Sequence, residues 1–176
     1  MKAIIDCGGW KGDSVSVLKK RFGNCIVHSF ECVPDFFKYY KNVENNILHK
    51  KAVWIYDGEV TIYLQDNIEW DGHSLCIEKN VDPVIAVKHP ITVPCIDFSE
   101  WILNNFKITD ELYLKMNIEG SEYKVLDKMI KDGSIDYINY GIIHFHQPRY
   151  PEITTSCDHE RILHEVGKRI KIETSG

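Results

Sequence analysis

The chain has 176 residues, of which 44% are hydrophobic and 27% are charged, and its formal net charge is −5. This length and composition predict one globular domain with room for a substantial core. The negative charge and the lack of a basic run argue against a nucleic-acid-binding surface. No apolar run approaches the roughly 18 residues that a membrane span needs.

Six cysteines are scattered along the chain without a C-x-x-C pair, and no segment has the pattern of a signal peptide. Disulfides belong mainly to secreted proteins, so this arrangement predicts reduced cysteines and a cytoplasmic location. The first strand-like run begins by residue 3, and the chain stops soon after the last one. We therefore expect one domain over residues 1–176, which could be excised from a longer multidomain chain.

Strand-like and helix-like segments alternate along the chain. In order, the expected elements are a strand at 2–7, a helix at 12–23, a strand at 25–31, a helix at 34–43, a strand within 47–55, a strand at 58–65, a loop at 66–83, one or two short strands within 84–96, a helix at 97–106, a strand at 111–118, a helix at 120–133, a strand at 138–147, a helix at 157–169 and a strand at 170–173.

Local signals set these boundaries. Short apolar runs predict buried strands, whereas the period-two alternation at 58–65 predicts a half-exposed strand that could be antiparallel. Asp13 or Ser14 is expected to cap the first helix, and Gly23 to end it. Pro90 and Pro94 are expected to break the segment in which they lie.

This alternation predicts an α/β fold, with a mainly parallel sheet covered by helices on both faces. In such a sheet, ligands bind beyond the carboxyl ends of the strands, where the strand order reverses beside the first strand. Candidate functional residues should therefore follow the strands.

A glycine turn follows the first strand, with glycines at positions 8, 9 and 12. These do not match the G-x-G-x-x-G pattern of dinucleotide sites, because position 10 is Trp. Asp6 ends the strand, and its carboxylate would repel a pyrophosphate but suit a cationic ligand, such as the ammonium of S-adenosylmethionine. Alternatively, Asp6 only forms the turn by bonding its own backbone.

Glu31 ends the second strand, 25 residues after Asp6. An acid at this place accepts hydrogen bonds from the ribose hydroxyls of an adenosine cofactor. The alternative is a solvent-facing residue at a strand end.

The stretch YLKMNIEGSEYKVL, residues 113–126, joins a strand to a helix. Lys115 and Asn117 lie on one face of that strand, and Glu119 and Glu122 follow at the turn. Both acids could serve the helix start alone, because carboxylates are favourable there. Their expected place at the carboxyl end of the strand beside the first strand favours a functional role.

Together these stretches resemble the FkbM-type family of S-adenosylmethionine-dependent O-methyltransferases. The family pattern is roughly D-x-G-A-N-x-G-D at the first strand, F-E-P at the second and L-K-I-D-x-E-G-x-E-Y-x-V-L at the fourth. The matching stretches here are DCGGWKGD, FECVP and LKMNIEGSEYKVL, with KAVWIYDGEVTIYL, GHS and VPCIDFSEWI between them. The resemblance spans residues 3 to about 145 and implies a Rossmann-like class I methyltransferase fold, here without a clear seventh strand.

The resemblance also implies a cofactor site. Glu31 would bind the ribose, Ala52 and Val53 would edge the adenine, and Ser74 and Asn117 would lie close to the cofactor. The residues expected at the methionine half and along the rest of the site are Asp6, Gly8, Gly9, Gly12, Asp13, Ser14 and Cys32. Asn117 stands where the family usually has Asp, so the position keeps its polarity but loses charge and basicity.

Methyl transfer to a hydroxyl needs a group that removes the hydroxyl proton. The candidates at the carboxyl edge are Glu119, Glu122, His144 and His146. The two histidines are two apart on a strand and so point to the same side, where one could be the base or both could help bind a metal. Alternatively, they are polar residues at the end of a buried strand, and we expect no metal.

The acceptor is expected to be a sugar or glycan, because members of the family often act on polysaccharides or glycosylated natural products. Trp10, Trp70 and Tyr123 could stack on a sugar ring or simply pack in the core, and His73 could reach the acceptor. A glycosyltransferase domain, fused or associated, would be a fitting partner. The alternatives are a non-catalytic cofactor-binding module and a nicotinamide-dependent oxidoreductase.

Overall fold

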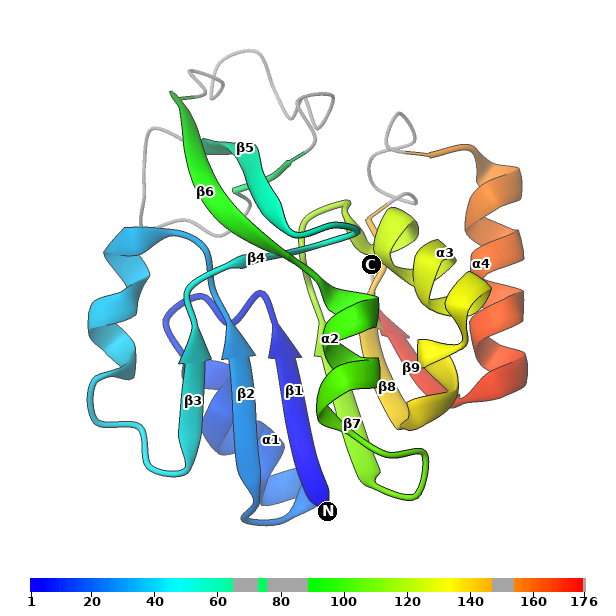
Figure 1. Cartoon of the computed structure of the whole chain (residues 1–176), viewed down its shortest axis with the longest axis horizontal. Helices are drawn as coiled ribbons and strands as arrows, with labels where there is room; N and C mark the ends of the chain where they lie inside the picture. Colours follow the sequence, from blue (N-terminus) through cyan, green and yellow to red (C-terminus); the bar gives the residue numbers. More distant parts are fainter. Residues whose placement is uncertain (65–72, 76–88, 147–153, 176) are drawn as a thin grey trace.

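The main element of the fold is a parallel sheet (Figure 1). The computed structural model describes residues 1–64, 73–75, 89–146 and 154–175. Within this part, six strands pair in the order β3-β2-β1-β7-β8-β9, and every pair is parallel. Their bounds are Lys2–Cys7 (β1), Ile26–Phe30 (β2), Asn46–His49 (β3), Glu111–Met116 (β7), Ile138–His144 (β8) and Lys171–Ser175 (β9).

Helices cover both faces of this sheet, as the alternating pattern predicted. Along β1, Ala3, Ile5 and Cys7 belong to one core cluster and Ile4 to another, because successive side chains point to opposite faces. The first cluster contains residues of α2 (Phe98–Asn105), α3 (Glu122–Asp132), η2 (Ser134–Tyr137) and α4 (Ser156–Arg169). The second contains residues of α1 (Asp13–Phe22) and the 3-10 helix η1 (Pro34–Tyr40).

The strand order reverses at β1, which pairs with β2 on one side and β7 on the other. The chain builds outward from β1 through β2 and β3, then returns at β7 and builds outward through β8 and β9. Ligand sites in α/β sheets lie beyond the carboxyl ends at such a reversal. The predicted fold class is therefore confirmed, and it places the candidate site above β1, β2 and β7.

A second, three-stranded sheet was not predicted. Its order is β4-β6-β5, with bounds Ala52–Trp54 (β4), Gly58–Leu64 (β5) and His89–Asp97 (β6). It lies beyond the carboxyl ends of β1, β2 and β3 (Figure 1). The segment 47–55 therefore holds parts of two strands in two sheets, because the chain leaves the main sheet after His49 and buries Ala52 and Val53 elsewhere.

The two prolines of β6 do not break it. β6 runs unbroken from His89 to Asp97 and pairs with β5 in the predicted antiparallel sense. Pro90 and Pro94 are four residues apart, so both ring nitrogens face the same edge. The strand on that edge is β4, which pairs only with Cys95–Asp97 of β6. Neither proline faces a described strand there, so no ladder hydrogen bond is lost.

Two helix boundaries match the prediction and two differ from it. The N-cap of α1 is Gly12 with φ 79°, and neither Asp13 nor Ser14 caps it, because the Ser14 hydroxyl instead donates to Asp6. Gly23 and Gly133 end α1 and α3 as predicted. The expected helix at 34–43 is a 3-10 helix that ends at Tyr40.

Some expectations lie outside the described residues. These are most of the loop at 66–83 including Trp70, the first part of the segment 84–96, and the end of the strand expected at 138–147. No helix in the described ranges combines the length and apolar character needed to cross a lipid bilayer.

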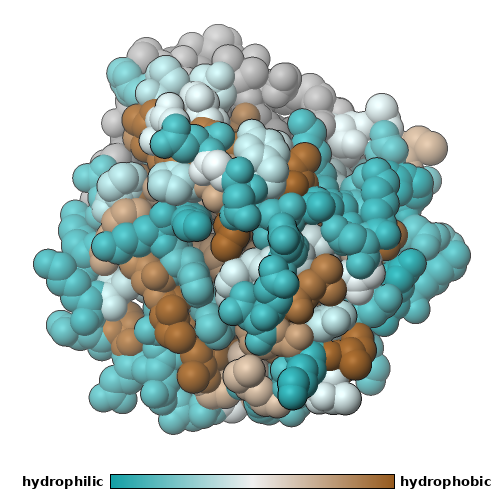
Figure 2. Space-filling model, viewed as in Figure 1, coloured by the Kyte–Doolittle hydropathy of each residue, from teal (hydrophilic) through white to brown (hydrophobic). Residues whose placement is uncertain are grey.

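The face of the sheet that carries α2 is only partly covered. Figure 2 shows polar residues over most of this view and a stripe of apolar residues over β2 and β3. Ile26 and Ile47, in these two strands, are 43% and 46% exposed. On this face α2 reaches β2 through Trp101, whose ring meets those of His28 and Phe30.

Candidate functional site

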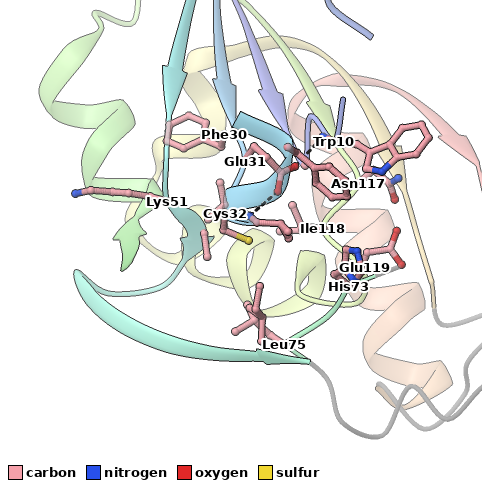
Figure 3. A pocket seen from close by; sticks show the side chains of 16 residues that line it. Trp10, Phe30, Glu31, Cys32, Lys51, His73, Leu75, Asn117, Ile118 and Glu119 are labelled. Carbon is pink, nitrogen blue, oxygen red and sulfur yellow. Dashed lines mark hydrogen bonds between the residues drawn. The ribbon is translucent and has the colours of Figure 1, made fainter. Parts of the chain in front are cut away.

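A pocket lies at the reversal point, between the carboxyl ends of β1, β2 and β7 and the small sheet (Figure 3). Its lining residues are Gly8, Trp10, Phe30, Glu31, Cys32, Val33, Phe36, Lys51, Ala52, Val53, Ile62, His73, Leu75, Asn117, Ile118 and Glu119.

Glu31 presents a buried carboxylate to this pocket. One of its oxygens accepts the backbone N–H of Trp10 at 2.7 Å, and the other accepts that of Val33 at 2.8 Å. Burial raises the pKa of Glu31 to about 7, against the lowering effect of these backbone bonds. Each oxygen keeps a lone pair for a further donor, so the carboxylate is oriented in advance to receive two hydroxyls.

Asp6 lies behind the pocket wall and is fully buried. Its carboxylate accepts the Ser14 hydroxyl at 2.5 Å and lies 3.1 Å from the Lys115 ammonium. Lys115 also donates to the Gly8 carbonyl at 2.7 Å. The sequence analysis expected Asp6 to face a cationic ligand, but Asp6 does not line the pocket. Its cationic neighbour in the structure is Lys115, and this ion pair joins β1 to β7.

The glycines of the turn allow close packing within the protein. A Cβ on Gly8 would lie 1.9 Å from the Asn117 carbonyl oxygen, and φ of Gly8 is +78°. A Cβ on Gly9 would lie 2.2 Å from the Tyr40 hydroxyl. Protein atoms therefore occupy the space beside both glycines, and Gly8 alone of the three turn glycines lines the pocket.

Two non-glycine residues at the pocket have left-handed backbones. φ is 49° at Trp10, after β1, and 58° at Glu119, after β7. Such a conformation costs side-chain-bearing residues of order 1–2 kcal/mol, and it tends to persist where it serves a site. Here it follows the two strands that flank the reversal point.

Glu119, Glu122 and His146 form a buried cluster beyond β7 and β8. One His146 ring nitrogen, Nε2, lies 3.3 Å from a Glu119 carboxylate oxygen, and the other, Nδ1, lies 3.2 Å from a Glu122 oxygen. Glu122 accepts the backbone N–H groups of Ile118 and Gly120, each at 2.7 Å. The His144 ring lies edge-on to that of His146, with centroids 4.6 Å apart.

Ser74 supports Glu119 from the small sheet. Its hydroxyl donates to the Glu119 carbonyl at 2.5 Å, and its backbone forms an isolated bridge with Tyr63 at the end of β5. Ser74 is buried but does not line the pocket, whereas its neighbour His73 does and lies beside Glu119 (Figure 3).

The structure brings part of the expected residue set together at the pocket. The expected cofactor or catalytic residues that line it are Gly8, Glu31, Cys32, Ala52, Val53, Asn117 and Glu119. Those that do not line it are Asp6, Gly9, Gly12, Asp13, Ser14, Ser74, Glu122, His144 and His146. Of the residues expected at the acceptor, Trp10 and His73 line the pocket, whereas Tyr123 is buried and its hydroxyl lies 3.0 Å from His159 Nδ1.

Sequence reasoning missed several lining residues, namely Phe30, Val33, Phe36, Lys51, Ile62, Leu75 and Ile118. Several adjoin expected residues, since Phe30 precedes Glu31 and Lys51 precedes Ala52. Nothing in the sequence indicated that Ile62 lines the pocket, because Ile62 lies on β5 of the small sheet, which was not predicted. Cys32, which also lines the pocket, is a neutral thiol. Burial raises its pKa well above the usual range, so it contributes a weakly polar surface to the pocket wall.

Two buried polar atoms beside the pocket lack hydrogen-bond partners. These atoms, the side-chain oxygen of Asn117 and the indole nitrogen of Trp10, belong to residues that line the pocket. A buried polar atom without a partner costs free energy, which a ligand can recover.

The described residues contain no group of three or more His, Cys, Asp or Glu side chains arranged to hold a metal ion.

Comparisons with known proteins agree with this geometry. A family model described as "Methyltransferase FkbM domain" matches residues 6–170. The fold is similar to the crystal structure of methyltransferase FkbM from Methylobacillus flagellatus KT, with a TM-score of 0.52 and 13% sequence identity. The similarity covers 97% of this chain but 38% of that one, so the chain spans well under half of its length. No curated protein matches the chain.

Proposed function

The chain belongs to the FkbM methyltransferase domain family, and on this premise we propose that it transfers the methyl group of S-adenosylmethionine to a hydroxyl of a sugar or glycan. The cofactor would supply a methyl group bound to a sulfonium sulfur, and the thioether that leaves needs no proton. The protein's tasks are then to bind and orient two molecules and to accept the hydroxyl proton.

The observation that carries the cofactor proposal is the Glu31 carboxylate. It directly follows β2 at the pocket wall, and two backbone N–H groups fix its direction. A vicinal diol can donate one hydroxyl to each of its oxygens, as the ribose of an adenosine ligand does. Ala52 and Val53 provide an apolar wall nearby for a base, and the partnerless Asn117 oxygen is an acceptor suited to an ammonium.

The glycine turn argues against a dinucleotide cofactor. In dinucleotide sites a pyrophosphate lies at the N-terminus of the helix after the first strand. Here no residue of α1 lines the pocket, its first turn carries the acidic Asp13, and Tyr40 and Asn117 fill the space beside the glycines. This arrangement supports S-adenosylmethionine over a nicotinamide cofactor.

The acceptor proposal is supported by aromatic surface at the pocket. The Trp10 and Phe36 rings meet edge-on, with centroids 6.2 Å apart, and both residues line the pocket. Aromatic faces suit the C–H-rich faces of sugar rings. A fused or associated glycosyltransferase and a cytoplasmic location belong to the same proposal and rest on the sequence considerations alone.

The cofactor proposal can be tested by isothermal titration calorimetry. Wild-type protein is titrated with S-adenosylhomocysteine, S-adenosylmethionine and NAD in parallel, and the titrations are repeated on Glu31→Gln. The matched control is Glu59→Gln, an exposed glutamate on β5. We expect binding of the two adenosyl ligands without NAD, weakened about tenfold or more by Glu31→Gln alone, since a hydrogen bond to a charged group contributes roughly 1.5–3 kcal/mol.

Two results would contradict the proposal. Binding of NAD in preference to the adenosyl ligands would make the nicotinamide alternative correct. Adenosyl ligands that bind wild type and Glu31→Gln equally well would show that the pocket at Glu31 does not hold the ribose.

A further inference from the structure

We propose that Glu119 is the base that accepts the hydroxyl proton of the acceptor, and that His146 and Glu122 position it. This inference rests on the proposed function and narrows the four candidate residues to one catalytic group. In the step, the acceptor O–H bond breaks and its proton passes to a Glu119 oxygen, while the freed electron pair forms the O–CH₃ bond and the electrons of the S–CH₃ bond stay on sulfur.

Accessibility separates the two carboxylates. The Glu122 side chain is 0% exposed and both of its oxygens already accept backbone N–H groups. The Glu119 side chain is 14% exposed and lines the pocket. Only Glu119 can therefore meet an acceptor in the pocket, and Glu122 instead fixes the turn on which Glu119 lies.

His146 lies between the two carboxylates and away from the acceptor. Its side chain is 5% exposed, and it does not line the pocket. Its two ring nitrogens face Glu119 and Glu122 at 3.3 and 3.2 Å. A base is more effective when a third group orients it, and this order of acid, imidazole and acid provides that orientation.

The backbone of Glu119 is held for this task. Its φ of 58° is unfavourable for a residue with a side chain, and the Ser74 hydroxyl donates a hydrogen bond to its carbonyl. Strained conformations that the surroundings hold in place cluster at functional sites. The same turn carries Asn117, which cannot act as a base, so Glu119 is the acid of this stretch that reaches the pocket.

The first test compares two substitutions of Glu119. Glu119→Gln keeps the size of the side chain without a basic oxygen. Glu119→Gly suits the left-handed backbone and leaves space in which a small carboxylate can bind. Transfer of labelled methyl from S-adenosylmethionine is measured on a panel of methyl glycosides, with Glu160→Gln, an exposed glutamate of α4, as control.

We expect kcat to fall about 100-fold or more in both Glu119 variants and to stay unchanged in Glu160→Gln. Sodium formate should restore part of the activity of Glu119→Gly but not of Glu119→Gln, and sodium chloride at the same concentration should restore neither. The affinity for S-adenosylhomocysteine should stay within about twofold of wild type, because Glu119 is assigned to the acceptor.

The positioning role needs a measurement that does not depend on activity. Nuclear magnetic resonance of ¹⁵N-labelled histidine side chains reports the hydrogen bonding of each ring nitrogen. We expect Glu119→Gln to shift the Nε2 signal of His146 and Glu122→Gln to shift its Nδ1 signal, with the signals of His89 and His164 unchanged. Unaltered His146 signals in both variants would overturn the positioning role.

The outcomes separate this inference from its premise. Wild-type protein that binds adenosyl ligands but methylates no glycoside would remove the proposed acceptor, and the assignment of Glu119 with it. Wild-type transfer that persists in Glu119→Gln would leave the proposed function standing and overturn Glu119 as the base. Loss of transfer without rescue by formate, together with weakened cofactor binding, would also overturn it.

Discussion

At the scale of single residues, Glu31 shows how one side chain can serve binding at a cost to folding. Its two backbone bonds favour the charged form, but burial outweighs them and raises its pKa to about 7. A carboxyl with a raised pKa in the folded state binds its proton more tightly there than in the unfolded chain. Ionising Glu31 therefore weakens folding, while the ionised form is the one that would receive the ribose hydroxyls in the proposed function.

The first prediction concerns cofactor affinity and pH. In the proposed function the ribose hydroxyls donate to the ionised carboxylate, so affinity for S-adenosylhomocysteine should be full well above pH 7 and fall as the pH is lowered through 7. Calorimetric titrations from about pH 5.5 to about pH 8.5 extend about 1.5 units to either side of the Glu31 pKa. They should show this decline in the wild type. In Glu31→Gln the affinity should be weaker and flat over the same range, and an equal decline there would refute the assignment.

The second prediction concerns stability and has the opposite sign. The unfolded carboxyl titrates near its ordinary value of 4.5 and the folded one near 7, so stability contributed by protonated Glu31 is present at low pH and is lost as the pH rises between these values. The full difference corresponds to about 3 kcal/mol. Urea unfolding is measured at about pH 5 and about pH 8, near the lower end of this range and above its upper end. Between these two pH values the wild type should lose more stability than Glu31→Gln, and equal losses in the two proteins would contradict the prediction.

At the scale of elements, the glycines divide into those that the fold requires and those that it tolerates. Gly8 has φ +78° and its Cβ position lies 1.9 Å from the Asn117 carbonyl oxygen, whereas the nearest atom to a Cβ on Gly167, in α4, is 3.9 Å away. The turn between β1 and α1 can pack against the end of β7 only because Gly8 has no Cβ. α4 has no such need at Gly167.

The third prediction follows from this contrast. Gly8→Ala should destabilise the protein by about 3 kcal/mol or more, since the clash is with backbone and the conformation is left-handed. Gly167→Ala should stabilise it by roughly 0.5–1 kcal/mol through helix propensity. Thermal and urea unfolding measure both, and a Gly8→Ala variant as stable as wild type would show that the turn can move away from β7.

Prediction from sequence succeeded where local chemistry decides the outcome. Gly23 and Gly133 end α1 and α3 at their predicted places, Gly133 in the left-handed conformation. It failed where pairing between distant segments decides. Pro90 and Pro94 read as strand breakers, yet β6 passes through both because β4 pairs only with its last residues. Likewise, Asp6 was expected to face a cationic ligand, and no local signal indicated its ion pair with Lys115 on another strand.

At the scale of the whole molecule, the Asp6–Lys115 ion pair joins the two halves of the sheet at the reversal point. Asp6 lies on β1 and also receives the Ser14 hydroxyl from α1, while Lys115 lies on β7 and also binds the Gly8 carbonyl. One buried pair therefore connects two strands, a helix and the turn of the site. Its loss should affect the fold as a unit rather than one segment.

The fourth prediction tests this connection. Lys115→Met leaves the Asp6 carboxylate buried without its cation and should cost about 3–5 kcal/mol in urea unfolding. Adding Asp6→Asn should recover a large part of that loss, because it removes the uncompensated charge. The control Lys131→Met, which breaks an exposed pair with Asp127 on α3, should cost less than about 0.5 kcal/mol. Equal losses in the single and double variants would contradict the coupling.

The indole of Trp10 has a practical consequence. It lines the pocket, and its nitrogen is buried without a hydrogen-bond partner, whereas Trp54 and Trp101 do not line the pocket. A ligand that enters beside Trp10 will change the polarity around that ring. Under the proposed function, the intrinsic fluorescence of Trp10 would then serve as a label-free screen for acceptors before any methylated product has been identified.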